Sequence, residues 1–553
     1  MSTTKKCTLT CTKLDDFGKG ICYMDGKTVF VDNLLPGESA DVETIFEYGK
    51  LNRIRVLKRL NNSPYRVKPL CKYYQNCGGC SLQHLSYEEQ LKYKQQKVKD
   101  LIKKFAKIEV NVEPTIGLKE PLHFRNKVQV PLALNNKTKK IISGFYQENT
   151  HKIIPNDECL IESTISTEIR NLVLKTLNDF KIQPYDRKTN KGTVRHVLIK
   201  VSEYYNSVML CFVTATDDLY GAQNIIKTLL KKEPRIKTVV QNINKRDTNV
   251  ILGEKTRVLY GTGQIKDRLC GLDFLISAKS FYQTNSKLTE TLYNTAINAL
   301  QLTKEDTVLD AYCGTGTIGL AISKYVKEVV GVEIEHSSIL DAEKNKKINN
   351  IENISFIEDD CTEYLMNNCE EGKYSAVVMD PPRAGSTKEF IAALEKISPR
   401  QIVYISCDPV TLARDLGYFT NYEIKRVIPV DMFPHTFHVE TLVVLSKKIP
   451  DSHINIDVEF GEGKGQFSLK KIKECAEARK PKEKVTYKMI QEYIEKTYGF
   501  KVHTAYIAEV KRDLGLPMYD APNAVEELKR PRAHPTPKMA KAIKETLKHF
   551  EII

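Results

Sequence analysis

The sequence lacks any apolar run approaching the roughly 18 residues needed to cross a membrane. Its first residues, MSTTKKCTLT, also lack the apolar core of an export signal. Hydrophobic residues make up 41% and charged residues 28% of the 553 residues, unlike the composition of disordered or collagen-like chains. We therefore expect a soluble cytoplasmic protein that makes no membrane contact and folds into three or four units with large buried cores.

A disulfide framework is also excluded. The chain has 14 cysteines, and a protein without an export signal keeps its thiols reduced. Metal binding or catalysis is therefore the expected use of the reactive cysteines.

Positive charge exceeds negative charge. The chain has 84 Lys and Arg against 69 Asp and Glu, a net charge of +15, and residues 1–110 hold 20 basic against 12 acidic side chains. Such a basic end is typical of a surface that meets a polyanion such as nucleic acid. A solvated lysine-rich surface would give the same count, so composition alone leaves both interpretations open.

Residues 1–62 are expected to form a small β-barrel of the OB type. Short apolar runs such as Val29–Val31 alternate with turn signals such as Asp25-Gly26 and Pro36-Gly37. Aromatic residues interleaved with basic ones suit an RNA-binding barrel. The same aromatic residues could equally be ordinary core residues.

The next segment, residues 63–275, is expected to be a central α/β domain. A Lys- and Gln-rich stretch from Ser86 to Phe105 predicts an exposed helix. Strand-like runs such as Lys127–Val130 and His196–Val201 follow. None of these runs indicates a particular chemistry.

From residue 285 the pattern changes to alternating helices and strands. A strand expected at Thr307–Asp310 runs into the glycine-rich turn Cys313–Thr317, and a helix is expected from Ile318 to Tyr325. Glycines at such a turn let the backbone approach a ligand at the helix N-terminus. A G-x-G turn alone is a weak signal. The next strand ends in Glu333, about 20 residues on, where an acidic residue binds ribose hydroxyls.

Two further strands also end in acidic residues. The strand Ile354–Ile357 precedes Glu358-Asp359-Asp360, and the strand Ala376–Met379 precedes Asp380-Pro381-Pro382-Arg383. A D-P-P strand end downstream of a G-x-G turn is typical of S-adenosylmethionine methyltransferases, whereas dinucleotide-binding folds need a fuller G-x-G-x-x-G. The alternative is a Rossmann-like domain in which D-P-P merely ends a strand.

A cysteine follows the fifth strand of this series. The strand Gln401–Ile405 leads into Ser406-Cys407-Asp408-Pro409 and then a helix, which places Cys407 at the carboxyl edge of a parallel sheet. An isolated cysteine is usually a small buried hydrophobe. At a helix N-terminus, however, backbone N–H groups and the helix dipole favour the thiolate, as in nucleophilic cysteines.

A methyl donor beside a nucleophilic thiol suggests methylation of an unreactive ring carbon. Uracil C5 becomes nucleophilic once a thiolate adds to C6, and a base must later remove the C5 proton. Cys407 would supply the thiolate. Glu440, just before the terminal strand Thr441–Leu445, is the candidate base, with His435 as the second candidate.

Five ordered motifs carry a specific resemblance: F-Y-Q-T-N at 281–285, D-A-Y-C-G-T-G-T at 310–317, D-P-P-R at 380–383, S-C-D-P at 406–409 and H-x-E at 438–440. Together they resemble the RNA (uracil-5-)-methyltransferases, and within them the 23S rRNA branch, over residues 1–447. The family usually has S-C-N-P, so Asp408 is a departure that could raise the pKa of the neighbouring thiol. The resemblance implies Cys407 as nucleophile and Glu440 as base, with contacts to the methyl donor from Gln283, Tyr312, Glu333 and Asp380 and also from Thr317 and Asp360.

Four other cysteines form a candidate metal site. Cys71, Cys77 and Cys80 are closely spaced and Cys159 lies far along the chain. Four thiolates suit either structural zinc or an iron–sulfur cluster, so ligand count leaves both open. The resemblance implies a [4Fe–4S] cluster held by these four, and it implies that the N-terminal barrel is a TRAM domain that binds RNA. The C-x3-C-x2-C spacing of radical enzymes that also use S-adenosylmethionine is absent.

Residues 448–553 are expected to be a linker followed by a small helical extension of unknown role. Helices are predicted at Tyr487–Thr497 and Thr504–Leu514, and Thr536-Pro537 is a good start for a last helix. The spacing of the first two suits a helix-turn-helix or, equally, an αα-hairpin packed on the methyltransferase.

The sequence thus predicts an α/β protein with a Rossmann-like class I methyltransferase domain at residues 276–447. We expect a monomeric enzyme that uses S-adenosylmethionine to make 5-methyluridine in 23S rRNA, acting on a loop or on a flipped-out nucleotide. The alternatives are the same chemistry on tRNA and a non-catalytic iron–sulfur RNA-binding protein.

Overall fold

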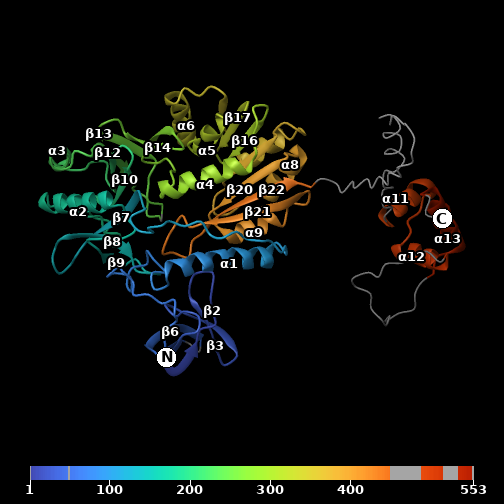
Figure 1. Ribbon diagram of the computed structural model, residues 1–553, viewed down its shortest axis with the longest axis horizontal. Helices are drawn as coiled ribbons and strands as arrows, with labels where there is room; N and C mark the ends of the chain where they lie inside the picture. The colour runs from blue at the N-terminus through green and yellow to red at the C-terminus, as the bar shows by residue number, and fades with distance from the viewer. Residues whose placement is uncertain (1, 48–49, 249, 449–486, 515–533, 551–553) are drawn as a thin grey trace, which may run out of the picture. The chain divides into compact units, whose positions relative to one another are not determined.

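The computed structural model describes residues 2–47, 50–248, 250–448, 487–514 and 534–550 (Figure 1). The chain divides into two compact units, Met1–Ile449 and Pro450–Ile553. Within the described ranges, no helix has the length and apolar character needed to span a membrane. Most of the linker expected after residue 447 lies outside the described residues.

The N-terminal part of the larger unit is rich in β-structure. Two three-stranded sheets, β1-β5-β6 and β2-β3-β4, are antiparallel throughout. Strands of both sheets contribute to one small core that includes Leu9, Cys22, Val29 and Val42. The strands are β1 (Ser2–Thr10), β2 (Lys13–Leu14), β3 (Gly20–Met24), β4 (Lys27–Val31), β5 (Ser39–Glu47) and β6 (Lys50–Arg59).

The aromatic residues of this region lie on its surface. Phe17, Tyr23 and Phe30 are 59%, 57% and 52% exposed. The interpretation of these three as core residues is therefore wrong, because the small core is filled by aliphatic and cysteine side chains. Tyr48, the fourth aromatic residue of the pattern, lies outside the described residues.

Helix α1 (Tyr87–Phe105) follows, with Ser86 at its N-cap position. The expectation of an exposed helix is wrong. Lys94 is fully buried and Lys97 is 9% exposed, because both amino groups donate hydrogen bonds to the segment before Glu440. The apolar positions of the same face pack against α9 and β21.

A central seven-stranded sheet has the order β13-β12-β11-β10-β7-β8-β9. Helices α2 and α3 contribute, with this sheet, to one hydrophobic core (Figure 1). A two-stranded ribbon, β14-β15, follows it in the chain. The elements are β7 (Lys127–Leu134), β8 (Ile141–Tyr146), β9 (Ile153–Pro155), α2 (Thr164–Asp179), β10 (Val194–Ser202), β11 (Ser207–Thr214), α3 (Ala222–Lys232), β12 (Ile236–Ile243), β13 (Lys255–Tyr260), β14 (Gln264–Leu269) and β15 (Leu272–Ser277).

The second seven-stranded sheet has the order β18-β17-β16-β19-β20-β22-β21. Its first five strands are parallel, β22 runs antiparallel to them, and β21 runs antiparallel to β22, which confirms the expected Rossmann-like sheet. The elements are α4 (Ser286–Ala299), β16 (Thr307–Ala311), α5 (Thr317–Ser323), β17 (Glu328–Glu333), α6 (His336–Ile348), β18 (Ile354–Glu358), α7 (Cys361–Asn367), β19 (Ala376–Met379), α8 (Lys388–Ile397), β20 (Gln401–Ser406), α9 (Pro409–Leu416), β21 (Tyr422–Val430) and β22 (Glu440–Lys447).

Successive residues of these strands serve two separate cores. Val308 and Val378 point into one core, with α4 and α5, whereas Leu309 and Val377 point into the other, with α1, α7, α8 and α9. Such a sheet is buried on both faces, which explains its nearly continuous apolar strands. The first core also includes Leu198 of the central sheet, so the two large sheets share a continuous interior.

The smaller unit contains three described helices: α11 (Tyr487–Tyr498), α12 (Thr504–Asp513) and α13 (Pro537–His549). Their apolar faces meet in one core that includes Ile490, Ile507 and Ile543. Thr536 caps α13 by accepting a hydrogen bond from the Met539 amide, as its sequence predicts.

Candidate active site

The register of the second large sheet brings its carboxyl edge together. Met379 pairs with Ala311 on one side and with Tyr404 on the other, and Ser406 pairs with Thr441 of the antiparallel β22. The residues that follow these pairs therefore leave the sheet at one edge. They are Tyr312, Asp380 and Cys407, and Glu440 directly precedes Thr441, the partner of Ser406.

The glycine-rich turn lies at the same edge. Gly316 has φ +76°, and a Cβ there would lie 2.5 Å from Cζ of Phe356. Gly314, with φ +55°, has nothing within 4 Å of a Cβ position, and its amide donates to the Glu333 carboxylate at 3.0 Å. The turn thus needs glycine at both positions and leaves backbone open beside an acidic residue that ends β17.

The Asp310 side chain is hydrogen-bonded to the helix that follows this turn. Its carboxylate accepts a hydrogen bond from the Gly319 amide at 2.8 Å. Burial raises the pKa of Asp310 to about 7, although that hydrogen bond opposes the shift. A carboxylate in this position fixes the first turn of α5 against β16.

Two other residues that are expected to contact the methyl donor lie near the glycine-rich turn. The Asp360 carboxylate caps α7 by accepting from the Thr362 and Glu363 amides at 2.8 and 3.1 Å. The Thr317 hydroxyl lies 3.1 Å from the Tyr293 hydroxyl. Asp360 thus follows the end of β18, whose last residue pairs with Glu333, and Thr317 follows the glycine-rich turn after β16.

Gln283 belongs to a segment tied to three parts of the molecule. Its carbonyl accepts from the Asn126 amide group at 3.2 Å, just before the central strand β7. Two residues on, Asn285 caps α4 and also donates to the Met432 carbonyl at 3.2 Å. Phe281 at the start of the segment is 61% exposed. The F-Y-Q-T-N segment therefore links the central sheet to the edge that carries Glu440.

Burial and nearby carboxylates determine the pKa of Cys407. Burial, followed by the charges of Glu440 and Asp380, raises the pKa of the Cys407 thiol to about 11, and Arg383 opposes this shift. The expected thiolate-favouring effect of the helix start is thus outweighed in the free protein. The thiol becomes easier to ionise when the two carboxyl groups are protonated.

Glu440 and Asp380 form a coupled acidic pair. Glu440 is 2% exposed. Burial raises the pKa of both carboxyl groups; the charge of Asp380 raises the pKa of Glu440 further, while Arg383 lowers it. A carboxyl group whose pKa is moved toward neutrality suits a general base.

Asp408, the departure from the family pattern, acts as a helix cap. Its carboxylate accepts a hydrogen bond from the Val410 amide at 2.9 Å at the start of α9. Asp and Asn cap helices about equally well. Asp408 does raise the pKa of Cys407, as expected, but its effect is smaller than those of burial, Glu440, Asp380 and Arg383.

His435 is engaged by α1. Its backbone amide donates a hydrogen bond to the Gln90 side chain at 3.1 Å, and its ring Nδ1 lies 3.3 Å from Gln90 Nε2. The residue has φ +66° and is 8% exposed.

Sequence reasoning missed Arg383 as a charge that acts on Cys407 and Glu440, although its place in the D-P-P-R motif was a signal.

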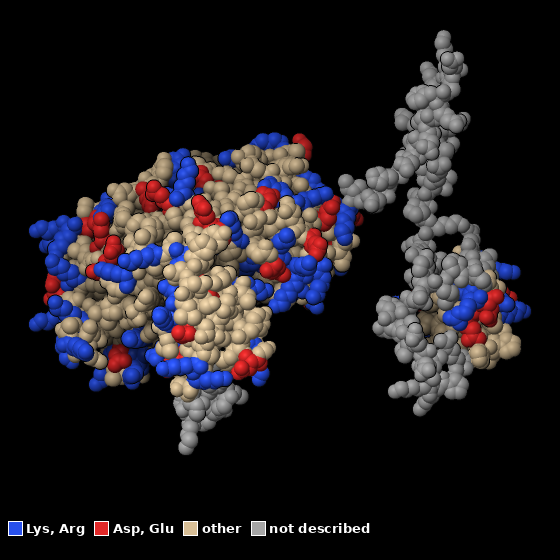
Figure 2. Space-filling model, turned by 60° about the horizontal axis from the view of Figure 1, so that its bottom comes forward, with Lys and Arg blue, Asp and Glu red and all other residues tan. Residues whose placement is uncertain are grey.

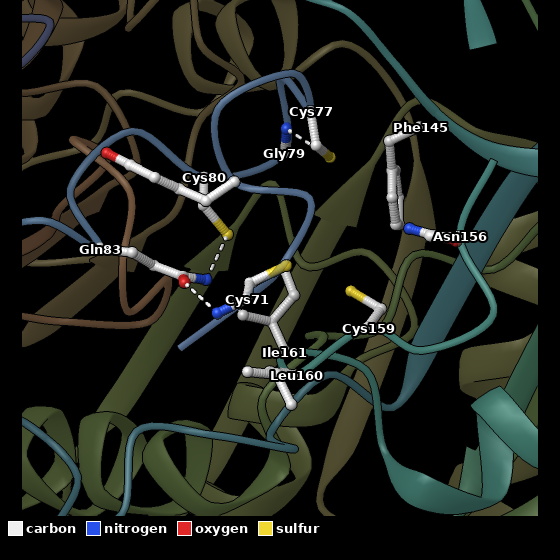
Figure 3. A pocket seen from close by; sticks show the side chains of 11 residues that line it. Cys71, Cys77, Gly79, Cys80, Gln83, Phe145, Asn156, Cys159, Leu160 and Ile161 are labelled. Carbon is white, nitrogen blue, oxygen red and sulfur yellow. Dashed lines mark hydrogen bonds between the residues drawn. The ribbon is translucent and has the colours of Figure 1, made fainter. Parts of the chain in front are cut away.

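The four candidate metal ligands border a single cavity. Cys71, Cys77, Cys80 and Cys159 line it, together with apolar side chains that include Phe145 (Figure 3). Burial raises the pKa of Cys80 and Cys159 to about 12. The structure thus brings together all four cysteines, although Cys159 lies far from the other three in the chain.

Their spacing bears on the kind of metal they could hold. Zinc–sulfur bonds of about 2.3 Å require four sulfurs to converge on one point. Among the described residues, no group of three or more Cys, His, Asp or Glu is arranged to hold a metal ion. An iron–sulfur cluster also takes four thiolates, at its separate iron atoms.

Comparison with known proteins shows the same kind of enzyme. The model of the tRNA (uracil-5-)-methyltransferase family matches residues 86–448. An uncharacterized RNA methyltransferase of Oceanobacillus iheyensis is 40% identical over 80% of this chain and 96% of its own. One from Caldanaerobacter subterraneus is 42% identical over 79% and 97%.

A solved structure is also similar. The tRNA (uracil-54, C5)-methyltransferase of Pyrococcus abyssi, in complex with S-adenosyl-L-homocysteine, is 26% identical and has a TM-score of 0.63. The similarity covers 79% of this chain and 100% of that one. The similarity therefore extends beyond the sheet to most of the larger unit.

Proposed function

Because the chain belongs to the RNA (uracil-5-)-methyltransferase family, we propose that it makes 5-methyluridine in 23S rRNA with Cys407 as nucleophile and Glu440 as base. That it is an S-adenosylmethionine-dependent RNA (uracil-5-)-methyltransferase follows from the family itself, so the non-catalytic alternative is set aside. The observations that support the residue roles are the pairing of Ser406 with Thr441, the neighbours of Cys407 and Glu440, and the effect of the Glu440 charge on the pKa of Cys407.

The proposed reaction uses both residues in turn. The Cys407 thiolate adds to C6 of the uracil, forming a C–S bond and moving electron density to C5. C5 would then take the electrophilic methyl group of S-adenosylmethionine, whose S–CH3 bond breaks to leave S-adenosylhomocysteine. The Glu440 carboxylate then accepts the C5 proton, the C–S bond breaks, and the Cys407 thiolate is released.

Six residues are proposed to contact the methyl donor. The open backbone at Gly314 and the Glu333 carboxylate beside it suit the binding of a nucleoside. Asp380, next to Cys407 at the strand edge, suits the donor's positive charge. The proposed contacts are Gln283, Tyr312, Thr317, Glu333, Asp360 and Asp380.

A [4Fe–4S] cluster is proposed at Cys71, Cys77, Cys80 and Cys159. The cavity that all four cysteines line supports a shared metal site, and the choice of a cluster over zinc rests on the family resemblance. The N-terminal β-rich region is proposed to be the RNA-binding TRAM barrel, which its three exposed aromatic side chains support. On the face that Figure 2 shows, lysine and arginine side chains that could contact phosphates lie among acidic side chains over the larger unit.

Transfer RNA is the second candidate substrate. The solved relative from Pyrococcus abyssi acts on tRNA, and the matching family model carries the same substrate in its name. The four cysteines support ribosomal RNA through the resemblance described above. The monomeric state, the cytoplasmic location and the division at residues 62, 275 and 447 stay predictions.

Mapping 5-methyluridine in RNA from a deletion strain separates the two substrates. Mass spectrometry of purified 23S rRNA and tRNA fractions, from the strain and from its parent, gives the lost sites. We expect loss from 23S rRNA and unchanged tRNA, restored by the wild-type gene but not by Cys407→Ala. Loss confined to tRNA would overturn the ribosomal assignment and leave the chemistry standing.

A further inference from the structure

The smaller unit has a surface that the proposed reaction does not use. The family match ends at residue 448, directly before this unit. Its described helices enclose a core of their own. The unit is therefore an addition to the methyltransferase, and its surface is the place to look for its role.

One face of α13 is lined with lysine. At about 100° per residue, Lys538, Lys541, Lys544 and Lys548 fall within an arc of roughly 120°, and all four are exposed. We refer to these four residues as the lysine face. The opposite side of the helix is buried and consists of Ala542, Ile543, Thr546 and Leu547.

Among the described residues, no ion pair involves any of the four lysines. Lys488 and Lys501 near α11 do have partners: Lys488 lies 3.9 Å from Glu492, and Lys501 lies 3.3 Å from Glu495. Glu545 falls within the same arc of α13, but its carboxylate accepts a hydrogen bond from the Tyr498 hydroxyl at 2.8 Å. With four lysines and one glutamate, the lysine face keeps a net positive charge that can bind a polyanion.

We propose that the lysine face binds phosphate groups of the substrate RNA outside the active site. RNA is the polyanion that this enzyme must hold, and lysine binds phosphate as a point charge without reading sequence. A membrane surface fits poorly, because the apolar side of α13 is already buried in the core and cannot insert into lipid.

The test measures RNA binding by the full chain as a function of salt. The test variant is Lys541→Gln/Lys544→Gln, and the matched control is Lys488→Gln/Lys501→Gln, which removes the same charge from paired lysines. The probe is an oligouridine of about 30 nucleotides. We expect a Kd about three- to tenfold higher for the test variant, and a slope of log K against log salt reduced by about 1.4.

The control variant should bind with the wild-type slope. Equal slopes for test, control and wild type would overturn the proposal, as would an equal loss in both variants. Because the readout is binding rather than methyl transfer, the result does not depend on the roles of Cys407 and Glu440.

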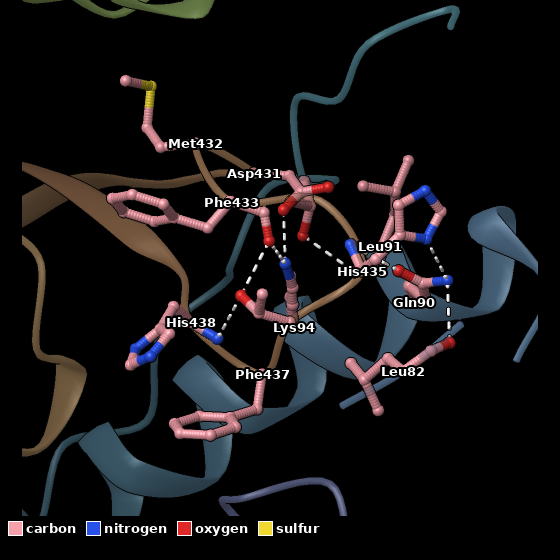
Figure 4. A network of polar contacts seen from close by, with 12 residues as sticks. Leu82, Gln90, Leu91, Lys94, Asp431, Met432, Phe433, His435, Phe437 and His438 are labelled. Carbon is pink, nitrogen blue, oxygen red and sulfur yellow. Dashed lines mark hydrogen bonds and ion pairs between the residues drawn. The ribbon is translucent and has the colours of Figure 1, made fainter. Parts of the chain in front are cut away.

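A second inference rests on the segment 431–439, which leads into Glu440. Lys94 on α1 forms a buried ion pair with Asp431 and donates to the Phe433 carbonyl at 3.1 Å (Figure 4). Lys97 donates to the Phe437 carbonyl at 3.0 Å. The backbone of the segment is thus held by side chains from one face of α1.

The cysteine site holds the same segment more directly. The Ser81 and Leu82 amides both donate to the His435 carbonyl, at 3.0 and 2.9 Å. The Phe437 amide donates to the Ser81 hydroxyl at 3.0 Å. Ser81 directly follows Cys80, and its carbonyl accepts from the hydroxyl of Tyr74, which lines the four-cysteine cavity.

We infer that Ser81 is a positioning residue that joins the four-cysteine site to the segment carrying Glu440. This inference rests on the proposed role of Glu440 as base. A shift of the segment would misplace the Glu440 carboxylate relative to the C5 proton. The step that suffers is then proton removal, after the C–S bond has formed, rather than donor binding.

The test compares Ser81→Ala, which removes the hydroxyl, with Ser81→Thr, which keeps it. Ser163→Ala is the matched control, because the Ser163 hydroxyl likewise accepts a buried amide hydrogen bond, from Ser166 at 3.1 Å, at the start of α2. We expect Ser81→Ala to lower kcat about tenfold with little change in KM for the donor. A covalent enzyme–RNA species should accumulate in denaturing gels, and Ser81→Thr should restore turnover.

Wild-type turnover in Ser81→Ala, or a rise in KM for the donor without a covalent species, would overturn the inference. So would the same loss in Ser163→Ala, since that would indicate general destabilisation. An active Cys407→Ala variant would instead overturn the proposed function, so the two failures are distinguishable.

Discussion

At the scale of single residues, the active site is a nucleophile surrounded by acidic groups. Glu440 and Asp380 raise the pKa of Cys407, and Arg383 opposes them. Protonation of Asp380 therefore eases ionisation of the thiol. Glu440 must itself be ionised when it takes the proton from C5, and its raised pKa makes it a stronger base for that step.

The first prediction concerns Glu440→Gln, which keeps the shape of the side chain and removes the base. Addition and methylation proceed, but proton removal does not, so a covalent enzyme–RNA species should accumulate on unmodified RNA. Turnover should fall about 10²- to 10⁴-fold. Denaturing electrophoresis and a methyl-transfer assay check both. Wild-type turnover in this variant would exclude Glu440 as the base.

The second prediction concerns pH. Burial and Asp380 raise the pKa of Glu440, so the ionised base forms only as pH rises above the ordinary carboxyl range. We expect kcat to rise with pH through neutrality. Arg383→Gln removes a charge that lowers this pKa, so the rise should move to higher pH. A pH–rate profile that is flat, or that moves to lower pH in Arg383→Gln, would contradict this account.

At the scale of elements, the sequence predicts the strand ends and the turns that follow them. The G-x-G turn, D-P-P and S-C-D-P each follow a short apolar strand, and the fold puts all of them at one edge. The sequence wrongly predicts an exposed helix α1, because its buried residues include Lys94 and Lys97 and lysine is ordinarily exposed. Their partners lie 81 to 340 residues away, so no local pattern could reveal them.

The third prediction concerns the glycine-rich turn. In Gly316→Ala, the added Cβ would lie 2.5 Å from the Phe356 ring at φ +76°, so the turn must move. We expect donor binding to be lost in calorimetry. Gly372→Ala is the control, because its φ is +78° but nothing lies within 4 Å of the Cβ position. Equal donor affinity in both variants would show that the turn does not form the donor site.

At the scale of the whole molecule, distant segments converge on two centres. Cys159 joins Cys71, Cys77 and Cys80 around one cavity, and Ser81 connects this cavity to the segment before Glu440. The sequence predicted the four cysteines through a family resemblance. It could not predict their connection to the active site, which depends on backbone hydrogen bonds between segments about 350 residues apart.

The fourth prediction concerns the four-cysteine site. Anaerobically purified protein should be brown, because iron bound to thiolate absorbs visible light and zinc does not. Ser substitution at Cys71, Cys77, Cys80 or Cys159 should remove the colour, whereas Cys270→Ser should keep it. Iron analysis and absorption spectra check this. A colourless protein with stoichiometric zinc would contradict the proposed cluster.

The most direct test of the central claim is the covalent adduct on Cys407. Incubation with 5-fluorouridine RNA and S-adenosylmethionine should trap the enzyme, because fluorine at C5 cannot leave as a proton. Mass spectrometry of digested enzyme should find a methylated, fluorinated nucleotide attached to Cys407, and Cys407→Ala should give no adduct and no methyl transfer. An adduct at another residue, or an active Cys407→Ala enzyme, would contradict the account.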